Sequence, residues 1–329
     1  MAKRASILGT GSALPEKIIT NFDMEKMMDT SDEWIRMRTG IERRRRLEDG
    51  KGASDLATEA GRKALLDANV QIEDIDLILV STLTSDMRLP AAACMVQEKL
   101  GVKEIPAFDI NAACTGFIYA LTIAQSFVET GQFKKILVIG VEILSRIINY
   151  KDRNTAVLFG DGAGATVVGE SDKEGGILAS ALKADGEGGK LLYTPAGGSL
   201  LPLTHEGLDQ DLDKVVMDGS EVFKYAARKM VEVSIEALEK CGLTVEDIDY
   251  VVPHQANIRI IQNAVKRMNI SMDKVYINIH EYGNMSSASI PVALDEASRA
   301  GFLKEGAIIL IVGFGAGLTW GASVIKWNK

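Results

Sequence analysis

The chain repeats itself about halfway along its length. The segment VQIEDIDLILV at 70–80 returns as LTVEDIDYVVP at 243–253, so an acidic turn followed by an apolar strand occurs twice, 173 residues apart. A helix-compatible segment with one apolar face precedes each copy. The faces consist of Leu56, Ala57, Ala60 and Ala64 in the first copy, and of Phe223, Ala226, Met230, Val233 and Ala237 in the second. Such similarity predicts two copies of one structural unit.

The two halves also end alike. The segments AVLFGDGAGATVVGE at 156–170 and IILIVGFGAGLTWGASVI at 308–325 each read as a strand, a glycine-rich turn and a second strand, which predicts a hairpin. The runs at 134–141 and 307–312 are apolar almost throughout, as is typical of strands that helices bury on both faces. The match of several elements in one order argues against chance. We therefore predict an α/β fold built from two halves, 1–173 and 174–329.

Composition excludes some classes of function. The 329 residues are 47% hydrophobic and 25% charged, which is ordinary for a globular protein with a large core. The formal net charge of −8 disfavours binding to nucleic acid or anionic membranes, so an acidic partner must bind a local basic patch. No apolar run reaches the roughly 18 residues of a membrane span, and the N-terminus lacks a signal-peptide pattern. Three cysteines without paired spacing favour a reducing, cytoplasmic location.

Three motifs carry little functional information. GTGS at 9–12 lacks the third glycine of a dinucleotide loop, since Leu14 stands in its place. RRRR at 43–46 lies between Glu42 and Glu48, so a solvated or salt-bridged segment is expected rather than a nucleic-acid site. The three histidines show no ligand spacing with each other or with a cysteine, and we predict no metal site.

One cysteine lies at the expected start of a helix. In FDINAACTGF at 108–117 an apolar stretch ends near Ile110, and helix-compatible sequence runs from about Thr115 to Glu129. Unpaired N–H groups and the macrodipole at a helix N-terminus favour a thiolate, so Cys114 is a candidate nucleophile. The alternative is an inert buried thiol, which suits Cys94 and Cys241 inside helix-like segments.

Two more polar residues follow strands of the second half. His254 comes directly after the repeated strand, where ligands bind in α/β folds, and Asn257 opens the helix that follows. Asn284 lies in a Gly-Asn turn before a small-residue segment, at the place that Cys114 holds in the first half. Each residue alone is consistent with a structural role. Together with Cys114 they indicate a site.

These motifs resemble those of thiolase-fold condensing enzymes, and most closely of the β-ketoacyl-acyl-carrier-protein synthase III family. The resemblance covers the chain from its first strand to its last hairpin. It implies a thiolase-like fold whose duplicated halves form α/β/α/β/α layers. The segments that carry it are TSDEWIRMRTGI at 30–41, NAACTGF at 111–117, FGDGAGA at 159–165, PHQAN at 253–257, GN at 283–284 and GFGAGLTWG at 313–321.

The resemblance also implies a reaction and roles for residues. An acyl group moves from coenzyme A to Cys114, and malonyl-acyl-carrier-protein then loses CO2 and condenses with it in the first step of type II fatty acid synthesis. His254 and Asn284 are the other catalytic groups, and their types suit an oxyanion hole for the enolate. Coenzyme A is a substrate, so no separate cofactor is implied. The remaining implied residues are Trp34, Arg38, Arg153 and Asn257 for coenzyme A, Gly315 for the acyl oxyanion, Arg259, Lys266 and Arg267 for carrier-protein docking, and Leu89 as an acyl-pocket gate reaching from the partner of a homodimer.

Alternatives remain at this stage. A condensing enzyme of secondary metabolism from the same subgroup fits equally, and a non-catalytic scaffold that only binds carrier protein belongs to another class. A degradative thiolase is disfavoured, because the final glycine-rich loop contains no second cysteine. Many relatives carry phenylalanine where this chain has Leu89, and the smaller side chain predicts tolerance of branched or longer primers.

Overall fold

The computed structural model describes residues 4–329, and two β-sheets organise them. The first sheet has the order β1-β7-β6-β4-β5 and the second has the order β11-β12-β13-β8. The strands of the first are β1 (Ala5–Ala13), β4 (Leu77–Ser81), β5 (Ala107–Ile110), β6 (Lys135–Ile143) and β7 (Asp161–Glu170). The strands of the second are β8 (Gly176–Ala184), β11 (Tyr250–Pro253), β12 (Ile308–Gly315) and β13 (Thr319–Lys326).

The two sheets are copies of each other. Strands β1, β7, β6 and β4 have the same order and the same relative directions as β8, β13, β12 and β11: the last two of each set are parallel and the other neighbours antiparallel. The edges of the two sheets beside β4 and β11 also correspond. Strand β5 runs parallel to β4 in the first half, and a parallel bridge joins Val275 to Val251 of β11 in the second half. The predicted duplication is confirmed.

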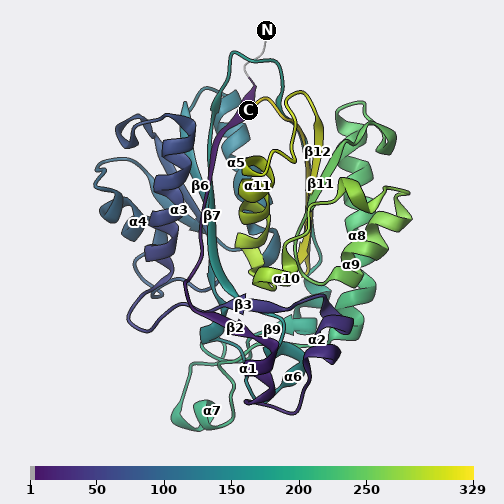
Figure 1. The fold of residues 1–329 in the computed structure, drawn as a ribbon. Helices are drawn as coiled ribbons and strands as arrows, with labels where there is room; N and C mark the ends of the chain where they lie inside the picture. Colours follow the sequence, from purple (N-terminus) through teal and green to yellow (C-terminus); the bar gives the residue numbers. More distant parts are fainter. Residues whose placement is uncertain (1–3) are drawn as a thin grey trace.

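Helices separate and cover the sheets (Figure 1). Helices α3 (Ala53–Ala68) and α4 (Ala92–Leu100) cover the outer face of the first sheet. Helices α8 (Gly219–Lys240) and α9 (Ile258–Arg267) cover the outer side of the second, and α5 (Gly116–Glu129) and α11 (Ser289–Arg299) lie between the sheets. The predicted α/β/α/β/α layering is therefore confirmed. No helix among residues 4–329 combines the length and apolar character needed to cross a membrane.

Shorter elements gather at the lower end of the sheets in Figure 1, and they surround the strand ends that carry the candidate residues. They are β2 (Ile18–Thr20), α1 (Asn21–Glu25), α2 (Asp32–Thr39), β3 (Arg43–Arg45), α6 (Arg153–Ala156), β9 (Leu192–Tyr193), α7 (His205–Asp209), β10 (Val216–Met217) and α10 (Ile279–Tyr282). Seven one-turn to two-turn 3-10 helices complete the described chain: η1 (Ile72–Asp74), η2 (Ala113–Thr115), η3 (Leu144–Arg146), η4 (Gly186–Leu191), η5 (Val245–Asp247), η6 (Met272–Lys274) and η7 (Ser286–Ala288).

The GTGS segment lets β1 pack closely against α3. A Cβ on Gly9 would lie 2.5 Å from the carbonyl oxygen of Ala64, and one on Gly11 would lie 2.5 Å from that of Ala60. Both carbonyls belong to α3, so the absent side chains let this helix approach the strand closely. The segment therefore serves the contact between helix and sheet.

One expectation about local structure is wrong, and a second holds only in part. Residues 156–170 form no hairpin: β7 pairs with β6 and β1, while Phe159 bridges to Asn284 of the second half. The expectation of a solvated or salt-bridged tract at 43–46 holds for Arg43, which forms ion pairs with Glu42 and Glu281, but not for Arg44. Arg44 is 3% exposed and donates to backbone carbonyls of Ile19 and Val157, and burial lowers its pKa to about 10. Carbonyl acceptors inside the fold compensate for the lost solvation of this guanidinium.

The predicted boundary between residues 173 and 174 falls between β7 and β8. Buried contacts cross it, for example the 2.9 Å hydrogen bond that the Thr10 hydroxyl donates to the Asp295 carboxylate. The description of the halves as two domains stays a prediction.

Candidate active site

Cys114 lies in η2, directly before α5, at the end of β5. The preceding residue, Ala113, has a φ of +46°, a left-handed conformation that turns the chain sharply into the helix. The hydroxyls of Thr115 and Thr319 both interact with the carbonyl of Ala112, so β13 holds this turn in place. The predicted position of Cys114 at a helix N-terminus is confirmed.

The expected thiolate is not what the surroundings favour. Cys114 is 6% exposed, and burial raises the pKa of its thiol to about 12. A hydrogen bond with Ser286 opposes this rise, whereas the carboxylate of Glu142 adds to it by repulsion. Desolvation of the sulfur anion outweighs the favourable helix terminus, so the resting residue is a thiol rather than a thiolate.

His254 directly follows β11 and is enclosed by protein, with 2% of its surface exposed. Its backbone N–H donates to Val312, and its Cβ is 3.5 Å from the Cβ position that a side chain on Gly313 would occupy. Among the described residues, neither ring nitrogen has a hydrogen-bond partner. Burial lowers its pKa to about 3, so the imidazole is neutral at physiological pH.

Two backbone hydrogen bonds hold Asn284 against the segment that precedes β7. Its backbone N–H donates to Leu158 at 2.8 Å, and its carbonyl accepts from Gly160 at 3.0 Å. The side-chain Oδ1 accepts from the N–H of Ser286 at 2.8 Å, which leaves the Nδ2 end of the amide as the donor for a ligand. Since Asn284 is 7% exposed, that donor acts in a largely dry environment.

The repeat places a different residue opposite Cys114 from the one expected. With the offset of 173 residues, Cys114 corresponds to Ser287, and Asn284 corresponds to Asn111. The backbone agrees, because Ser286 has the same φ of +46° as Ala113, and each donates its N–H to the Oδ1 of the asparagine two residues before it. The two turns are equivalent, but Asn284 lies three residues before the counterpart of Cys114.

Gly315 lies against Cys114. A Cβ on Gly315 would come within 2.8 Å of the backbone nitrogen and 3.1 Å of the Cβ of Cys114. The last residue of β12 must therefore be glycine for the two backbones to approach. This contact brings the backbone of the final glycine-rich loop to the candidate nucleophile.

A pocket of about 460 Å³ opens onto Cys114. Its walls include apolar side chains of Leu144, Ile147 and Val215, and these residues share a packed cluster with Trp34. Cys114 lines the pocket, whereas the buried residues His254 and Asn284 are not part of its lining. The pocket thus connects the thiol with the cluster around α2.

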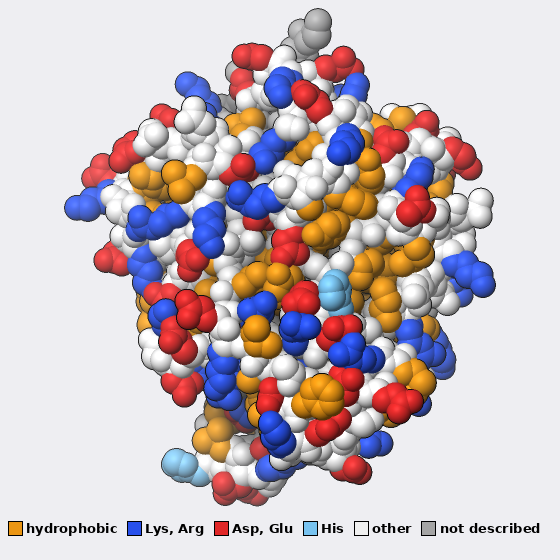
Figure 2. Space-filling model, viewed as in Figure 1, with side chains coloured by type: hydrophobic (Ala, Val, Ile, Leu, Met, Phe, Trp, Pro, Cys, Tyr) orange, Lys and Arg blue, Asp and Glu red, His pale blue; other side chains and the backbone are white. Residues whose placement is uncertain are grey.

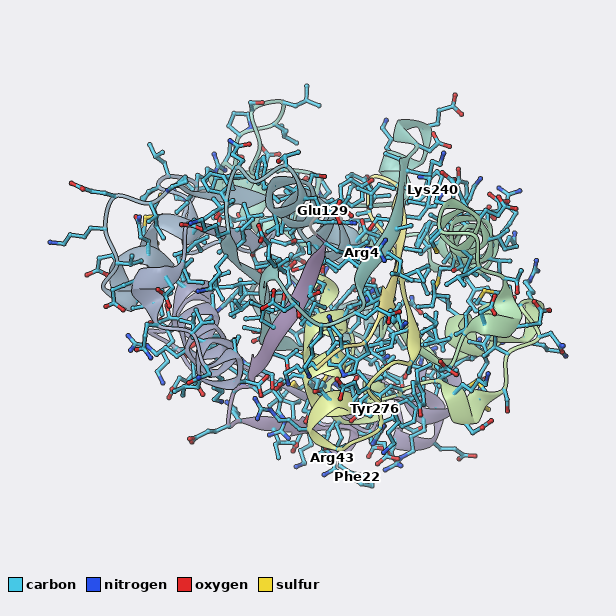
Figure 3. All side chains as sticks on the ribbon, turned by 90° about the horizontal axis from the view of Figure 1, so that it is seen from above. Arg4, Phe22, Arg43, Glu129, Lys240 and Tyr276 are labelled. Carbon is cyan, nitrogen blue, oxygen red and sulfur yellow. The ribbon has the colours of Figure 1, made fainter. Side chains whose placement is uncertain are left out.

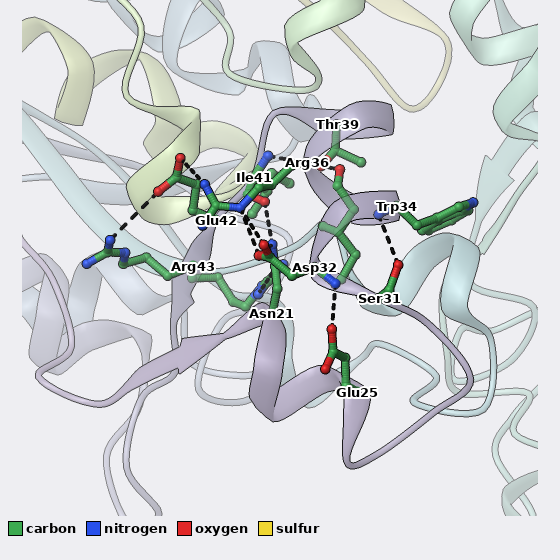
Figure 4. A network of polar contacts seen from close by, with 12 residues as sticks. Asn21, Glu25, Ser31, Asp32, Trp34, Arg36, Thr39, Ile41, Glu42 and Arg43 are labelled. Carbon is green, nitrogen blue, oxygen red and sulfur yellow. Dashed lines mark hydrogen bonds and ion pairs between the residues drawn. The ribbon is translucent and has the colours of Figure 1, made fainter.

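The structure brings the predicted coenzyme A residues together on α2 and α6. Ser31 caps α2 by accepting from the N–H of Trp34 at 3.1 Å, as Figure 4 shows. The guanidinium of Arg153 lies 5.0 Å from the ring centroid of Trp34, and that of Arg38 lies 6.0 Å from it. Asn257 is nearby, but its amide is used: it donates to the carbonyl of Arg38 and accepts from Arg259 to cap α9.

Helix α9 presents a basic outer face. Arg259, Lys266 and Arg267 are exposed, while Ile260 and Ile261 are buried beneath them. Within residues 4–329, no carboxylate forms an ion pair with any of the three cations. Elsewhere, on the face drawn in Figure 2, Lys and Arg side chains alternate with Asp and Glu. Helix α9 therefore carries three exposed cations that no carboxylate of the described residues neutralises in an ion pair.

Leu89 does not line the pocket of its own chain. It is 84% exposed, in a loop before α4. The neighbouring β5 is the edge strand of the first sheet, and Phe108 within it is 39% exposed. Both apolar side chains thus lie on the outer surface.

Sequence reasoning missed Glu142. This glutamate lies in β6, is 0% exposed, and accepts hydrogen bonds from Thr84, Ser286 and Ser287. Burial raises the pKa of its carboxyl to about 7. The signal in the sequence was a lone acidic residue in the apolar run ILVIGVEIL, since a buried charge requires partners.

A second pocket of about 570 Å³ lies at the opposite ends of β12 and β13, away from Cys114. Arg4 and Lys240, which line it, are labelled in Figure 3. Its wall combines cations with Glu174 and contains none of the predicted site residues.

Comparison with known proteins gives consistent matches. Residues 108–186 match the family model of 3-oxoacyl-[acyl-carrier-protein] synthase III, and residues 238–327 match the model of its C-terminal part. The β-ketoacyl-[acyl-carrier-protein] synthase III of Caldanaerobacter subterraneus is 60% identical over 99% of this chain and 98% of its own.

Solved structures agree with these matches. The crystal structure of 3-oxoacyl-[acyl-carrier-protein] synthase III from Aquifex aeolicus has a TM-score of 0.91 and 47% identity, covering 98% of this chain and 100% of its own. The priming β-ketosynthase of the R1128 polyketide pathway also has a TM-score of 0.91, with 36% identity over 100% of this chain and 98% of its own.

Proposed function

Because this chain belongs to the β-ketoacyl-[acyl-carrier-protein] synthase III family, we propose that Cys114, His254 and Asn284 carry out its reaction. The enzyme is an acyltransferase, the initiating condensing enzyme of fatty acid synthesis. The polyketide alternative is less favoured, since identity to the fatty acid relative is 60% and to the polyketide enzyme 36%. A scaffold that only binds carrier protein does not account for the buried, unpartnered imidazole.

In the first half-reaction the sulfur of Cys114 attacks the thioester carbon of acyl-CoA. The bond between that carbon and the coenzyme A sulfur breaks, and the proton of the thiol ends on the departing coenzyme A. The tetrahedral oxyanion receives hydrogen bonds from the backbone N–H groups of Cys114 and Gly315. The close approach of these two backbones supports this assignment.

In the second half-reaction the malonyl group on the carrier protein loses CO2. The resulting enolate oxygen receives hydrogen bonds from the ring N–H of His254 and the amide of Asn284. The carbanion bonds to the acyl carbon, the bond between that carbon and the sulfur of Cys114 breaks, and the released thiolate takes up a proton from solvent. The observation that carries this proposal is that both nitrogens of a buried, neutral imidazole lack partners. An unpaired buried polar group costs about 1–3 kcal/mol, and a substrate oxygen removes that cost.

Acyl transfer followed by condensation tests the function directly. The protein is treated with acyl-CoA, and intact mass is measured before and after malonyl-acyl-carrier-protein is added. We expect an acyl adduct that the second substrate discharges as β-ketoacyl-carrier-protein. A protein that gains no acyl mass, yet binds carrier protein, would be the scaffold of the alternative proposal.

Coenzyme A and carrier protein have separate proposed sites. The adenine of coenzyme A stacks on Trp34 between the guanidinium groups of Arg38 and Arg153, and Asn257 contributes by fixing the α2–α9 junction. The acidic carrier protein docks on Arg259, Lys266 and Arg267. Their unpaired charge supplies the local basic patch that a chain of net charge −8 needs for such a partner.

Two variants distinguish these sites. Reversing Arg259 and Lys266 to glutamate should raise the KM for malonyl-acyl-carrier-protein about tenfold while leaving the KM for acyl-CoA unchanged, because only the macromolecule contacts α9. Trp34→Ala should instead raise the KM for acyl-CoA and leave the KM for malonyl-acyl-carrier-protein unchanged, since loss of base stacking costs about 1–3 kcal/mol. Steady-state kinetics with each substrate varied in turn checks both, and equal effects on the two substrates would contradict separate sites.

A homodimer joined through β5 is proposed for the assembled enzyme. The unpaired edge and the exposed side chains of Phe108 and Leu89 support it, because an apolar edge strand is a template for pairing with a second copy. In this dimer Leu89 closes the acyl pocket of the partner. The three free cysteines support a cytoplasmic location, and the substrates need no separate cofactor.

The size of the side chain at position 89 predicts which primer the enzyme prefers. With leucine rather than a larger aromatic residue there, turnover with isobutyryl-CoA should exceed turnover with acetyl-CoA, and Leu89→Phe should reverse the order. Primer competition followed by mass analysis of the product measures this, with sedimentation of the same samples to establish the dimer. Preference for acetyl-CoA in the unchanged dimer would refute the roomy pocket, and a monomer would refute the shared gate.

A further inference from the structure

Glu142 connects the two repeats at the candidate site. It comes from β6 of the first half, and its Oε1 accepts from Ser286 at 3.1 Å and from Ser287 at 2.9 Å, both in η7 of the second half. Its Oε2 accepts from the hydroxyl of Thr84 at 2.6 Å and the N–H of Leu83 at 3.2 Å. A carboxylate with donors on both oxygens is well held in one orientation.

The backbone is shaped for this contact. At Gly140, two residues before Glu142, an added Cβ would collide with the carbonyl oxygen of Ser287. The glycine therefore lets β6 and η7 approach closely. Ser286 has a φ of +46°, so η7 begins at an unusual backbone conformation beside the carboxylate.

Ser286 also touches the nucleophile. Cys114 and Ser286 line the same pocket, and the Ser286 side chain opposes the rise in the pKa of the Cys114 thiol. Because the Ser286 hydroxyl donates its proton to Glu142, its oxygen is free to accept the proton of the thiol. The hydroxyl thus stands between a nucleophile and a base, and further donors fix the base itself.

We propose that Glu142 accepts the proton of Cys114 through Ser286 during acyl transfer, and that it is a positioning residue for the thiol. This inference rests on the proposed role of Cys114 as acyl acceptor.

The step balances without a further reactant. As the sulfur of Cys114 bonds to the thioester carbon, its proton moves to Ser286 Oγ and the proton of Ser286 moves to Glu142 Oε1. The bond between the carbon and the coenzyme A sulfur then breaks, and the thiolate that leaves takes a proton back along the same route. Glu142 is ionised again at the end, and free coenzyme A is released as a thiol.

Other groups suit this task less well. His254 is a poor base because burial lowers its pKa to about 3. The pKa of Glu142, raised to about 7, lies near the operating pH, where a general base is most effective. Its hydrogen-bond partners on η7 and the loop after β4 are uncharged, and Cys114 is the titratable group whose pKa it raises.

The test is the pH dependence of acyl-enzyme formation, followed by quenched flow and intact mass between about pH 5.5 and pH 9. In the wild type the rate should rise about tenfold per pH unit below the midpoint near 7 and then level off, because the base is then ionised. In Glu142→Gln the rate at about pH 8 should fall about 10²-fold. It should also keep rising to about pH 9, since only direct ionisation of a thiol with a high pKa remains.

Ser286→Ala is the second variant. Alanine suits the backbone there, because Ala113 has the same φ of +46° in the equivalent turn. It should reproduce the profile of Glu142→Gln without removing the carboxylate. The matched control is Ser287→Ala, which removes a donor to Glu142 away from the thiol: the levelling should persist, with its midpoint moved to higher pH.

Each outcome decides a separate point. If the rate of acyl-enzyme formation still levels off near pH 7 in both Glu142→Gln and Ser286→Ala, even at a reduced rate, the relay is overturned and the carboxylate has a structural role. If Glu142→Gln fails to fold by circular dichroism, Ser286→Ala alone decides. A wild-type protein that gains no acyl group on Cys114 would instead contradict the proposed function.

Discussion

Replacement of Cys114 by serine should lower the rate of acyl-enzyme formation by at least about 10³-fold, to below detection in an intact-mass assay. The hydroxyl is a much weaker acid than the thiol, and burial already penalises an anion at this position. The serine oxygen therefore remains protonated, and attack on the thioester stops. Binding of acyl-CoA should persist, since Trp34 and the pocket are untouched.

Cys241→Ser provides the matched control. Cys241 is a half-buried thiol that donates to the carbonyl of Leu238 at 3.2 Å, and a serine hydroxyl keeps that hydrogen bond. This variant should acylate at the wild-type rate. A full acyl adduct on the Cys114→Ser protein would contradict the assignment of the nucleophile.

Replacement of His254 by alanine should slow decarboxylation of malonyl-acyl-carrier-protein by about 10²-fold or more, the usual effect of removing an oxyanion donor. Acylation of Cys114 by acyl-CoA should continue, because the backbone donors of the first half-reaction remain. Radiolabelled CO2 release and acyl mass are measured on the same protein. Undiminished condensation by the variant would eliminate the proposed role.

The pH dependence adds a second readout for His254. Its pKa is lowered to about 3, so the imidazole stays neutral above about pH 4 and supplies its N–H throughout the neutral range. Wild-type decarboxylation should therefore show no step from an ordinary histidine near pH 6.5. The exposed histidine variant His205→Ala is the control and should retain the wild-type rate.

The repeat was the most informative feature of the sequence. Matching segments at 70–80 and 243–253 predicted two equivalent units, and apolar runs predicted strands buried on both faces; the sheet order confirms both. Trp34 and Arg38 are four residues apart, a spacing that places two side chains on one face of a helix, and the guanidinium of Arg38 lies over the Trp34 ring. Such predictions are possible because the spacing of residues within a single helix or strand determines which side chains share a face.

Features that depend on distant contacts were not predictable in the same way. The pKa of the Cys114 thiol depends on burial by both halves, which outweighs the local effect of the helix terminus. The failed hairpin at 156–170 has a similar cause, because Phe159 pairs with Asn284 of the other repeat. Glu142 was visible only as an anomaly in an apolar strand, since its partners Ser286 and Ser287 are more than 140 residues away.

The matching turns at Ala113 and Ser286 have a consequence for how such a protein can change. In a symmetric pair of identical chains, any substitution in one turn appears in the other as well. Here both copies lie in one polypeptide, so each position of the ancestral turn varies independently: one copy has Cys114 where the other has Ser287. In the proposed reaction this independence permits a division of labour, in which one turn bonds to the acyl group and the other accommodates the charge that develops on its reaction partner.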